Sequence, residues 1–397
     1  MLELFLALAI GIIIGLLAGL LPGLHPNNTI PIIVGLSFLF GPLPAAIILL
    51  TSGVVNSFVN FIPSILLGAP EDSSALGVLP GHKLLLQGRG YEAIKLCVVG
   101  CFGGVLFSML TLPFFTIFIP SLYNYLRPNV HWLLIFVVVY MILIDSKKFF
   151  SFIIFISSGL VGLIVLNNFS DSMLFPLLTG FFGLPMLLIS IFEKTKIPES
   201  FSFKENAFNF KSIFSSISIG SLAGIVAGLL PGVGATQSTI ITQQLFQKKN
   251  DERSFLISIG AITSSDIVYS IMALWLIKNP RSGIAVGISK LLEVGLKEVL
   301  IFIAFILISA SLATIITLKI SKFSLSFLKK INYQKLCILT SIFLFILTII
   351  FSGLIGLLVL FTSLSIGLIS NKIGIRRTSM MGCLLLPTIL FFIGIGI

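Results

Sequence analysis

Long stretches without charge dominate the pattern of hydrophobic and polar positions along this chain. No Asp, Glu, Lys or Arg occurs in residues 4–70, 212–247 or 336–371. A helix that crosses a bilayer needs roughly 20 apolar residues, so each stretch is long enough for one to three crossings. The pattern predicts an all-α polytopic membrane protein. The expected apolar segments are 2–21, 30–50, 53–69, 94–126, 130–144, 149–168, 173–192, 213–230, 236–246, 255–277, 298–318, 336–351, 353–370 and 379–396.

Composition supports this prediction. Of the 397 residues, 57% are hydrophobic and 10% are charged, whereas a soluble domain carries about 25% charged residues. The net charge of +11 comes from Lys and Arg between apolar segments, as expected for cytoplasmic loops, and no nucleic-acid partner is expected. Cys97 and Cys101 are joined by no His or carboxylate, so no metal site is expected. No cofactor is expected either, apart from Na⁺ as a coupling ion. The N-terminal segment is interpreted as a retained first helix, because it lacks a basic start and a cleavage site.

A polar linker, residues 193–211, separates two stretches that share a motif. Gly11–Thr29 reads GIIIGLLAGLLPGLHPNNT, and Gly220–Ser238 reads GSLAGIVAGLLPGVGATQS. A shared GLLPG core followed by small and hydroxyl residues predicts an internal duplication. The expected halves are residues 1–192 and 212–397, each a transmembrane repeat. An inverted arrangement is favoured, because an odd number of crossings is expected in the first half.

Two further matches support the duplication. KLLLQG at Lys83–Gly88 resembles KLLEVG at Lys290–Gly295, at nearly the same separation as the GLLPG pair. Within the GLLPG stretches, eight positions match at a constant offset. They are Gly11, Gly15, Ala18, Gly19, Leu20, Leu21, Pro22 and Gly23 against Gly220, Gly224, Ala227, Gly228, Leu229, Leu230, Pro231 and Gly232.

The Pro-Gly pair in each motif predicts a discontinuous helix. Proline cannot donate a helical hydrogen bond and glycine permits conformations closed to other residues. The break exposes backbone N–H groups at membrane depth, which is tolerated only inside protein or beside a water-filled cavity. A helix N-terminus attracts carboxylate or phosphate, so two breaks in pseudo-symmetric halves would form an anion site. Such paired breaks are typical of secondary transporters; the alternative is a pair of proline kinks with close glycine packing.

At these residues the chain resembles the TctA family, the large membrane permease subunit of tripartite tricarboxylate transporters. The family's G-x-L-P-G-x-G-P-like and P-G-x-G-A stretches appear here as GLLPGLHPNN and GLLPGVGATQS. Leu66–Ile94 resembles the family's small-residue segment, and the tail NKIGIRRTSMMGCLLLP looks family-like. His25 stands where the family has its second Gly, and the length is similar to that of short, archaeal-type members. The resemblance implies coupled uptake of di- or tricarboxylates, with a small membrane subunit and an extracellular (periplasmic) binding protein as partners.

Small and polar residues after the two breaks, with two serines of a later polar loop, are the candidate substrate-binding groups. N-capping of the following half-helix is an alternative role for the polar residues. For His25 the alternative is a structural role, and for the loop serines it is a solvated loop. The candidates are Pro22, Gly23, His25, Asn27, Asn28, Thr29, Ser73, Ser74, Pro231, Gly232, Gly234, Ala235, Thr236, Gln237, Ser238 and Thr239.

Asp266 is the candidate coupling residue. It lies in an apolar run with no basic neighbour within ten residues, and an intramembrane carboxylate is a functional candidate by default. It could bind Na⁺ with the hydroxyls of Ser264 and Ser265, or carry a proton. The alternative is an interfacial Asp at a helix end. The corresponding region of the first half offers Asn56, Ser57 and Asn60, of which Asn56 and Asn60 are retained as coupling candidates.

The sequence thus predicts a secondary active permease for small organic anions, di- or tricarboxylates, coupled to Na⁺ or H⁺ by alternating access. The main alternative is a translocase for polyprenyl phosphate or another lipid phosphate, since helix N-termini also bind phosphate. A channel is disfavoured by the paired breaks. An enzyme is not expected: Ser238, His25 and Asp266 could be imagined as a triad, but no nucleophile-elbow or metal motif occurs. Partners are the anion and membrane lipid, and a homodimer is left open.

Basic segments near the C-terminus predict the orientation. Leu318–Lys335 carries five Lys and no acid, and NKIGIRR adds three basic residues. Basic loops are retained in the cytoplasm, so residues 319–335 and 372–377 are expected there. The apolar residues between them are long enough for a hairpin, whose turn is predicted at Ser352 and Gly353.

Overall fold

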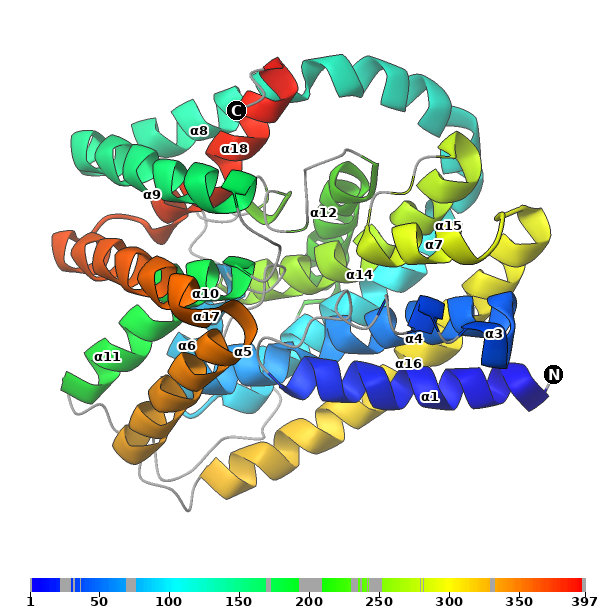
Figure 1. Cartoon of the computed structure of the whole chain (residues 1–397), viewed down its shortest axis with the longest axis horizontal. Coiled ribbons are helices and arrows are strands. Elements are labelled where there is room, and N and C mark those ends of the chain that lie inside the picture. The colour runs from blue at the N-terminus through cyan, green and yellow to red at the C-terminus, as the bar shows by residue number, and fades with distance from the viewer. Residues whose placement is uncertain are drawn as a thin grey trace.

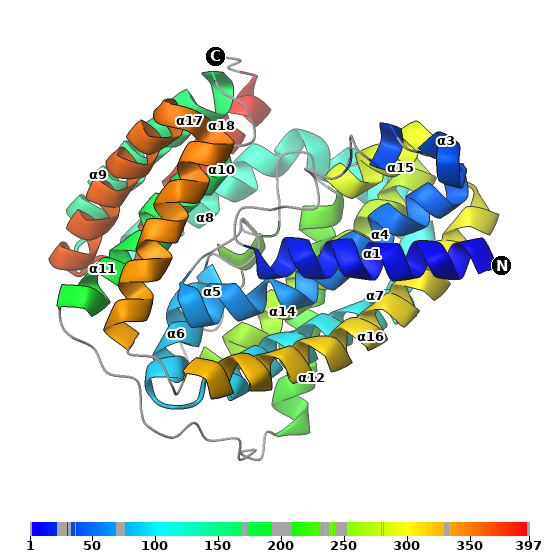
Figure 2. The same ribbon diagram turned by 60° about the horizontal axis from the view of Figure 1, so that its bottom comes forward.

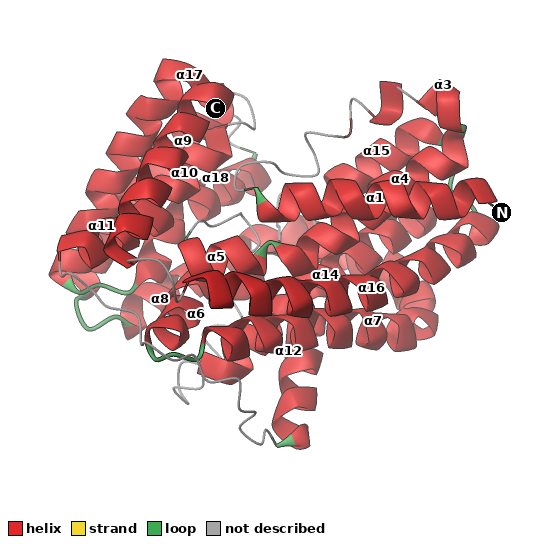
Figure 3. Cartoon of the chain, turned by 90° about the horizontal axis from the view of Figure 1, so that it is seen from below, coloured by secondary structure: helices red, strands yellow, loops and turns green. Residues whose placement is uncertain are grey.

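The computed structural model of the chain is shown in Figure 1. It describes residues 2–21, 30, 33–35, 37–68, 76–168, 173–192, 209–229, 235, 238–240, 242, 252–278, 280, 282–328 and 333–394. Within these ranges every regular element is a helix, as Figure 3 shows. The helices are α1 (Leu2–Leu20), α3 (Ser37–Phe40), α4 (Pro42–Val59), α5 (Phe61–Leu67), α6 (Val78–Leu86), α7 (Gly90–Leu126), α8 (Val130–Ile144), α9 (Lys148–Asn168), α10 (Leu174–Leu178), α11 (Leu184–Phe192), α12 (Phe210–Leu229), α14 (Glu252–Ile277), α15 (Gly283–Leu291), α16 (Leu296–Leu328), α17 (Tyr333–Ile373) and α18 (Gly382–Ile393).

Eight helical spans in the described part of the chain are long and apolar enough to cross a membrane. A spanning segment in lipid must satisfy its backbone hydrogen bonds internally, which a helix does. The prediction of an all-α polytopic membrane protein is confirmed. The spans are Leu2–Leu20, Pro42–Leu67, Gly90–Phe118, Lys148–Asn168, Phe210–Leu229, Glu252–Ile277, Leu296–Ser326 and Cys337–Ile373.

The helices form two groups, which Figures 1 and 2 show side by side. The major bundle comprises α1, α3 to α7, α12 and α14 to α16, and the minor bundle comprises α8 to α11, α17 and α18. In the major bundle α7 packs along α14, and in the minor bundle α9 packs against α18. Each bundle therefore contains helices from before and after the linker at residues 193–211.

The expected separation of segments 30–50 and 53–69 is wrong. Helix α4 runs without interruption through residues 51 and 52 and is followed at once by α5. The hydroxyls are accommodated by hydrogen bonds: Ser52 Oγ donates to the Leu49 carbonyl of its own helix at 2.8 Å, and Thr51 Oγ1 accepts from Ser309 Oγ of α16 at 3.2 Å. Hydroxyls that bond to helical carbonyls do not interrupt a membrane helix.

The expected hairpin near the C-terminus is confirmed by the backbone of α17. Gly353 has φ 61° and ψ −159°, which is non-helical, and the two arms on either side of it are helical. Positive φ favours glycine, because a Cβ is disfavoured there. Figure 2 shows the arms diverging from a common end, and the Phe345 and Phe361 rings pack across them with centroids 5.5 Å apart. The first and last residues of α17 therefore both lie at the end of the hairpin away from Gly353.

Glycines set the close approach of α1 to α4 and of α12 to α14. A Cβ at Gly15 would lie 2.6 Å from the Ser52 carbonyl oxygen, and a Cβ at Gly220 would lie 2.5 Å from that of Ser258. Small residues permit such approach between membrane helices, so the glycines of the repeated motif are packing residues. The other glycines in these contacts are Gly11, Gly19, Gly224 and Gly228.

The two most buried spans, α4 with α5 and α14, run in opposite directions. Helix α15 contacts α4 where Ile284 touches Gly53, and α6 packs against α5 at the far end. Helix α14 begins beside α6, where Lys83 Nζ lies 2.5 Å from Glu252 Oε1, and its end leads into α15. Between these landmarks α4 points from α15 towards α6, whereas α14 points from α6 towards α15.

The minor bundle is fastened by a buried carboxylate in the turn between α8 and α9. Asp145 Oδ1 accepts a hydrogen bond from the Lys147 backbone N–H at 3.0 Å, and its Oδ2 accepts one from the Arg376 N–H at 3.0 Å. The Ser151 and Ser379 hydroxyls meet at 2.7 Å nearby. Asp145 thus joins this turn to the segment after α17, and its role is structural.

Candidate functional site

The C-terminal end of α12, which leads into the second Pro-Gly break, packs against the middle of α14. A Cβ at Gly228 would lie 3.0 Å from the Asp266 carbonyl oxygen and 2.7 Å from the Tyr269 Cβ. Asp266 is half-buried, and its Oδ1 accepts a hydrogen bond of 3.3 Å from Ser270 Oγ. Asp266 lies well inside the helix Glu252–Ile277. The alternative of a capping Asp at a helix end therefore does not apply.

The two serines before Asp266 donate their hydroxyl hydrogens to backbone carbonyls and not to the Asp266 carboxylate. Ser264 Oγ donates to the Cys101 carbonyl of α7 at 2.7 Å, and Ser265 Oγ donates to the Ala261 carbonyl at 2.6 Å while packing against Gly224. The Ser270 hydroxyl, one helical turn further on, donates to the Asp266 carboxylate. Residues four apart share a helix face, and that spacing in the sequence is the signal by which Ser270 could have been found.

Tyr269 is a second neighbour that the sequence interpretation missed. Its hydroxyl lies 3.0 Å from Thr111 Oγ1 of α7, and its ring packs on Phe115 with centroids 4.7 Å apart. Thr111 Oγ1 is positioned to donate its single hydrogen to the Phe107 or Ser108 carbonyl. The Tyr269 hydroxyl is then the donor to Thr111. This contact fixes α14 against α7 just beyond Asp266.

The end of α1 stands against α4 in a similar manner. A Cβ at Gly19 would lie 3.3 Å from Asn56 Oδ1 and 2.8 Å from the Val59 Cβ. Asn56 and Asn60 are both buried, and Asn60 forms the junction of α4 and α5. The coupling candidates of the first half therefore lie beside the helix that leads into the first Pro-Gly break.

A short part of the segment after the second break is described. Ala235 packs in one cluster with Ala223 of α12 and Ile262 of α14. Thr239 Oγ1 donates to the Ala235 carbonyl at 2.7 Å, as in a helical turn. Ser238 is fully buried, and among the described residues its hydroxyl has no hydrogen-bond partner. The segment therefore lies at the depth of the middle of α14.

The remaining substrate-binding candidates lie outside the described residues. They are Pro22, Gly23, His25, Asn27, Asn28, Thr29, Ser73, Ser74, Pro231, Gly232, Gly234, Thr236 and Gln237. The next described residue after the first Pro-Gly pair is Ile30, whose side chain would lie 2.9 Å from a Cβ at Gly287 of α15.

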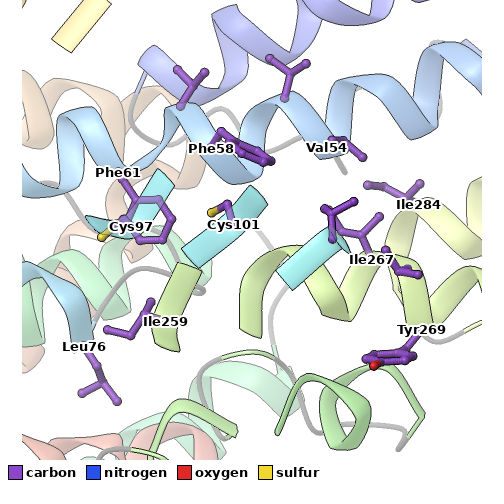
Figure 4. Packing of buried hydrophobic residues seen from close by; sticks show 14 of the residues in the cluster. Val54, Phe58, Phe61, Leu76, Cys97, Cys101, Ile259, Ile267, Tyr269 and Ile284 are labelled. Atoms are coloured by element: carbon purple, nitrogen blue, oxygen red, sulfur yellow. The ribbon is translucent and has the colours of Figure 1, made fainter. Parts of the chain in front are cut away.

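The middle of α7 packs against both glycine-packed helix pairs, and α4 and α14 also contact each other directly. Figure 4 shows Phe58 of α4, Cys101 of α7 and Ile259 of α14 in one continuous core. Cys101 Sγ donates to the Ser57 carbonyl at 3.5 Å, and a Cβ at Gly260 would collide with the Cys97 carbonyl. The candidate site is thus held by rigidly packed helices. Within the described part of the chain, no group of three or more His, Cys, Asp or Glu side chains is placed to hold a metal ion.

Ion pairs anchor the beginning of α14, far from Asp266 along the helix. Glu92 accepts two hydrogen bonds of 2.8 Å from Arg89, and Arg253 Nη2 lies 2.9 Å from Glu92 Oε1. The hydrogen bonds to Glu92 raise the pKa of the Arg89 guanidinium. Lys322 lies over the Tyr91 ring, 5.2 Å from its centroid. This end of the major bundle therefore carries several basic residues, among them Arg89, Arg253 and Lys322.

Taken together, the fold is that of a polytopic membrane protein, and a half-buried carboxylate of α14 lies beside the end of α12. The model of the Tripartite tricarboxylate transporter TctA family matches residues 5–382, and the chain belongs to this family. It is a transporter family and not an enzyme family. TctA proteins work with TctB and TctC partners in tripartite transporters.

One relative is similar along nearly its whole length. An uncharacterised protein of Methanocaldococcus jannaschii is 34% identical over 390 residues, which is 93% of this chain and 94% of that protein. No solved structure matches the chain.

Proposed function

We propose that this chain is a secondary active permease for small organic anions, of the di- or tricarboxylate class, coupled to Na⁺ or H⁺. The observation that carries the proposal is the position of Asp266, inside a membrane helix and against the end of α12 that leads into a Pro-Gly break. Membership of the tricarboxylate transporter family supports the substrate class. Transport proceeds by alternating access, with the anion held near the middle of the membrane.

The anion binds between Gly23–Thr29 and Gly232–Thr239, through backbone N–H groups and hydroxyls. An anion that enters a low dielectric loses several kcal/mol of solvation, and one helix terminus returns only about 0.3–2 kcal/mol. Two termini, several hydrogen bonds of about 1.5–3 kcal/mol each and a co-bound cation together offset that loss. The depth of Ala235 and the buried hydroxyl of Ser238 support this placement.

Asp266 holds the coupling cation. A charged carboxylate inside a membrane helix is costly, and a bound Na⁺ or proton lowers that cost by neutralising its charge. The nearby Ser270 hydroxyl is the first additional oxygen within reach. Because cation and anion then stabilise each other, the site binds its anion poorly when the cation is absent.

We also propose that the two halves, 1–192 and 212–397, are inverted repeats. Support comes from the matching glycine contacts and from the opposite directions of α4 and α14. Residues 319–335 and 372–377 then face the cytoplasm, in keeping with the shared side of the two ends of α17. A small membrane subunit and an extracellular binding protein are the proposed partners, and a homodimer is compatible with the same fold.

The decisive experiment measures binding and uptake of labelled citrate and succinate by purified protein, with and without Na⁺ and across pH. Asp266→Asn is expected to lose cation dependence and at least about tenfold in uptake, the equivalent of 1.4 kcal/mol. Glu293→Gln is the matched control, because Glu293 is an exposed carboxylate outside the site. Unchanged cation and pH dependence in Asp266→Asn would show that Asp266 is not the coupling group.

A competition arm separates the proposal from lipid-phosphate transport. Polyprenyl phosphate, added to proteoliposomes, is expected to leave citrate uptake unchanged. Inhibition by polyprenyl phosphate, together with no response to Na⁺ or pH in the wild type, would favour the lipid-phosphate translocase instead.

A further inference from the structure

Asn56 and Asp266 occupy corresponding positions in two separate helix contacts. Gly19, at the end of α1, faces Asn56 and Val59 of α4. Gly228, at the end of α12, faces Asp266 and Tyr269 of α14. The two glycines are 209 residues apart in the sequence. Asn56 and Asp266 are 210 residues apart, as are Val59 and Tyr269.

The same displacement holds along the whole contact. Each of the earlier glycines, two in α1 and two in α12, also meets two residues of the facing helix at a displacement of 210. The partners are Ile48 and Thr51 for Gly11, Ser52 and Val55 for Gly15, Ser258 and Ala261 for Gly220, and Ile262 and Ser265 for Gly224. Six residue pairs therefore share one register, which a chance similarity of two helix crossings would not produce.

This register of α4 relative to α14 is defined by the glycine contacts and not by similarity between the two amino-acid sequences. An alignment by sequence would match Thr51-Ser52 with Thr263-Ser264, at a displacement of 212. Asn56 would then be equivalent to Val268. The glycine contacts instead make Asn56 the position equivalent to Asp266. An amide therefore stands in one helix pair where a carboxylate stands in the other.

We propose that Asn56 is the uncharged counterpart of Asp266 and that it limits the transporter to one coupling cation per cycle. The inference rests on the proposed coupling role of Asp266. An amide oxygen can contact a cation but contributes no net charge, so it attracts the cation far less than a carboxylate at the same place. Asn56→Asp then adds a second cation position on the first half.

Four proteins test the inference: wild type, Asp266→Asn, Asn56→Asp and the double exchange Asn56→Asp/Asp266→Asn. Proteoliposomes report the ratio of ²²Na⁺ to labelled citrate taken up, or the ratio of protons to citrate if pH and not Na⁺ drives uptake. The ratio is expected to rise by one cation in Asn56→Asp. The exchange is expected to recover the single-cation ratio that Asp266→Asn loses, because the carboxylate moves to the corresponding position of the other half.

A matched control fixes the position of the charge. Asn60→Asp, combined with Asp266→Asn, adds the same charge four residues further on, at the junction of α4 and α5 and at the position that corresponds to Ser270. It is expected not to restore the cation dependence. Recovery by Asn60→Asp as well as by Asn56→Asp would show that any nearby carboxylate suffices and would overturn the correspondence.

A readout without substrate keeps this inference separate from the proposed substrate class. Thermal unfolding of each purified variant is followed as Na⁺ or pH is changed, since a cation that binds the folded state raises its stability. The cation response is expected in the wild type, absent in Asp266→Asn and present again in the double exchange. A double exchange that folds but gives no response would overturn the inference, even if wild-type citrate uptake is coupled as proposed. Absence of a response in the wild type would overturn the coupling role of Asp266 itself.

Discussion

Helix pairs α1–α4 and α12–α14 share one geometry and differ in chemistry. In each pair three glycines at the same spacing bring the helices into contact, and the first helix of the pair leads towards a Pro-Gly break. The side chains near the last glycine differ: Asn56, Val59 and Asn60 in the first pair stand where Asp266, Tyr269 and Ser270 stand in the second. The comparison teaches that close helix packing tolerates different polar groups, so a charge can be present in one of two helix pairs that share the same glycine contacts.

The largest effect is expected from removing the shared geometry. Gly15→Ala places a Cβ 2.6 Å from the Ser52 backbone carbonyl, which cannot move without shifting α4. Gly224→Ala instead meets the Ser265 hydroxyl, a side-chain group that can rotate away. Overpacking of this kind costs about 1–3 kcal/mol, and Gly15→Ala is expected at the upper end. The check is thermal unfolding in detergent.

Gly35→Ala is the control for these two variants, because a Cβ at Gly35 would meet no atom within 4 Å. It is expected to match the wild type. Equal losses for Gly15→Ala and Gly224→Ala would mean that the Ser265 hydroxyl is held as firmly as a backbone carbonyl.

The sequence predicted the frame well because its signals are strong. Missing charge marks the membrane segments, and glycine at Gly353 marks the reversal of α17. It predicted helix faces poorly, because a helix surrounded by apolar groups has no amphipathic period. The hydroxyls of Ser52 and Ser264 bond to carbonyls of their own or a neighbouring helix, so their presence in the sequence indicates neither a break nor a ligand. For the residues directly after the two breaks, the expectations stay predictions.

A middle-sized effect is expected where the two pairs differ at their other ends. Helix α4 is preceded by Gly41 and starts at Pro42. At the start of α14, by contrast, Arg253 forms an ion pair with Glu92 of α7, which also pairs with Arg89. Glu92→Gln removes the shared carboxylate. Hydrogen bonds to a charged group contribute about 1.5–3 kcal/mol when sheltered, and partial exposure reduces the expected loss to about 1–2 kcal/mol.

Salt tests the electrostatic origin of that loss. The difference in unfolding temperature between wild type and Glu92→Gln is expected to narrow between 0.1 and 1 M salt, as the screening length falls from about 10 to about 3 Å. The raised pKa of Arg89 contributes stability only below the range where that guanidinium loses its proton, so the difference should be constant between about pH 6 and 9. A salt-independent difference would assign the loss to packing.

The smallest effect is expected from the polar contact that only the second pair has. Tyr269→Phe keeps the ring against Phe115 and removes the hydroxyl that meets Thr111, whereas the corresponding Val59 has no such group. A single neutral hydrogen bond contributes about 0.5–1.5 kcal/mol, and the free energy of unfolding should fall by that amount. In a double-mutant cycle, Thr111→Val is expected to add little to Tyr269→Phe, because each removes the same bond. Additive losses would mean that the two hydroxyls act through separate partners, and the second helix pair would then differ from the first in charge alone.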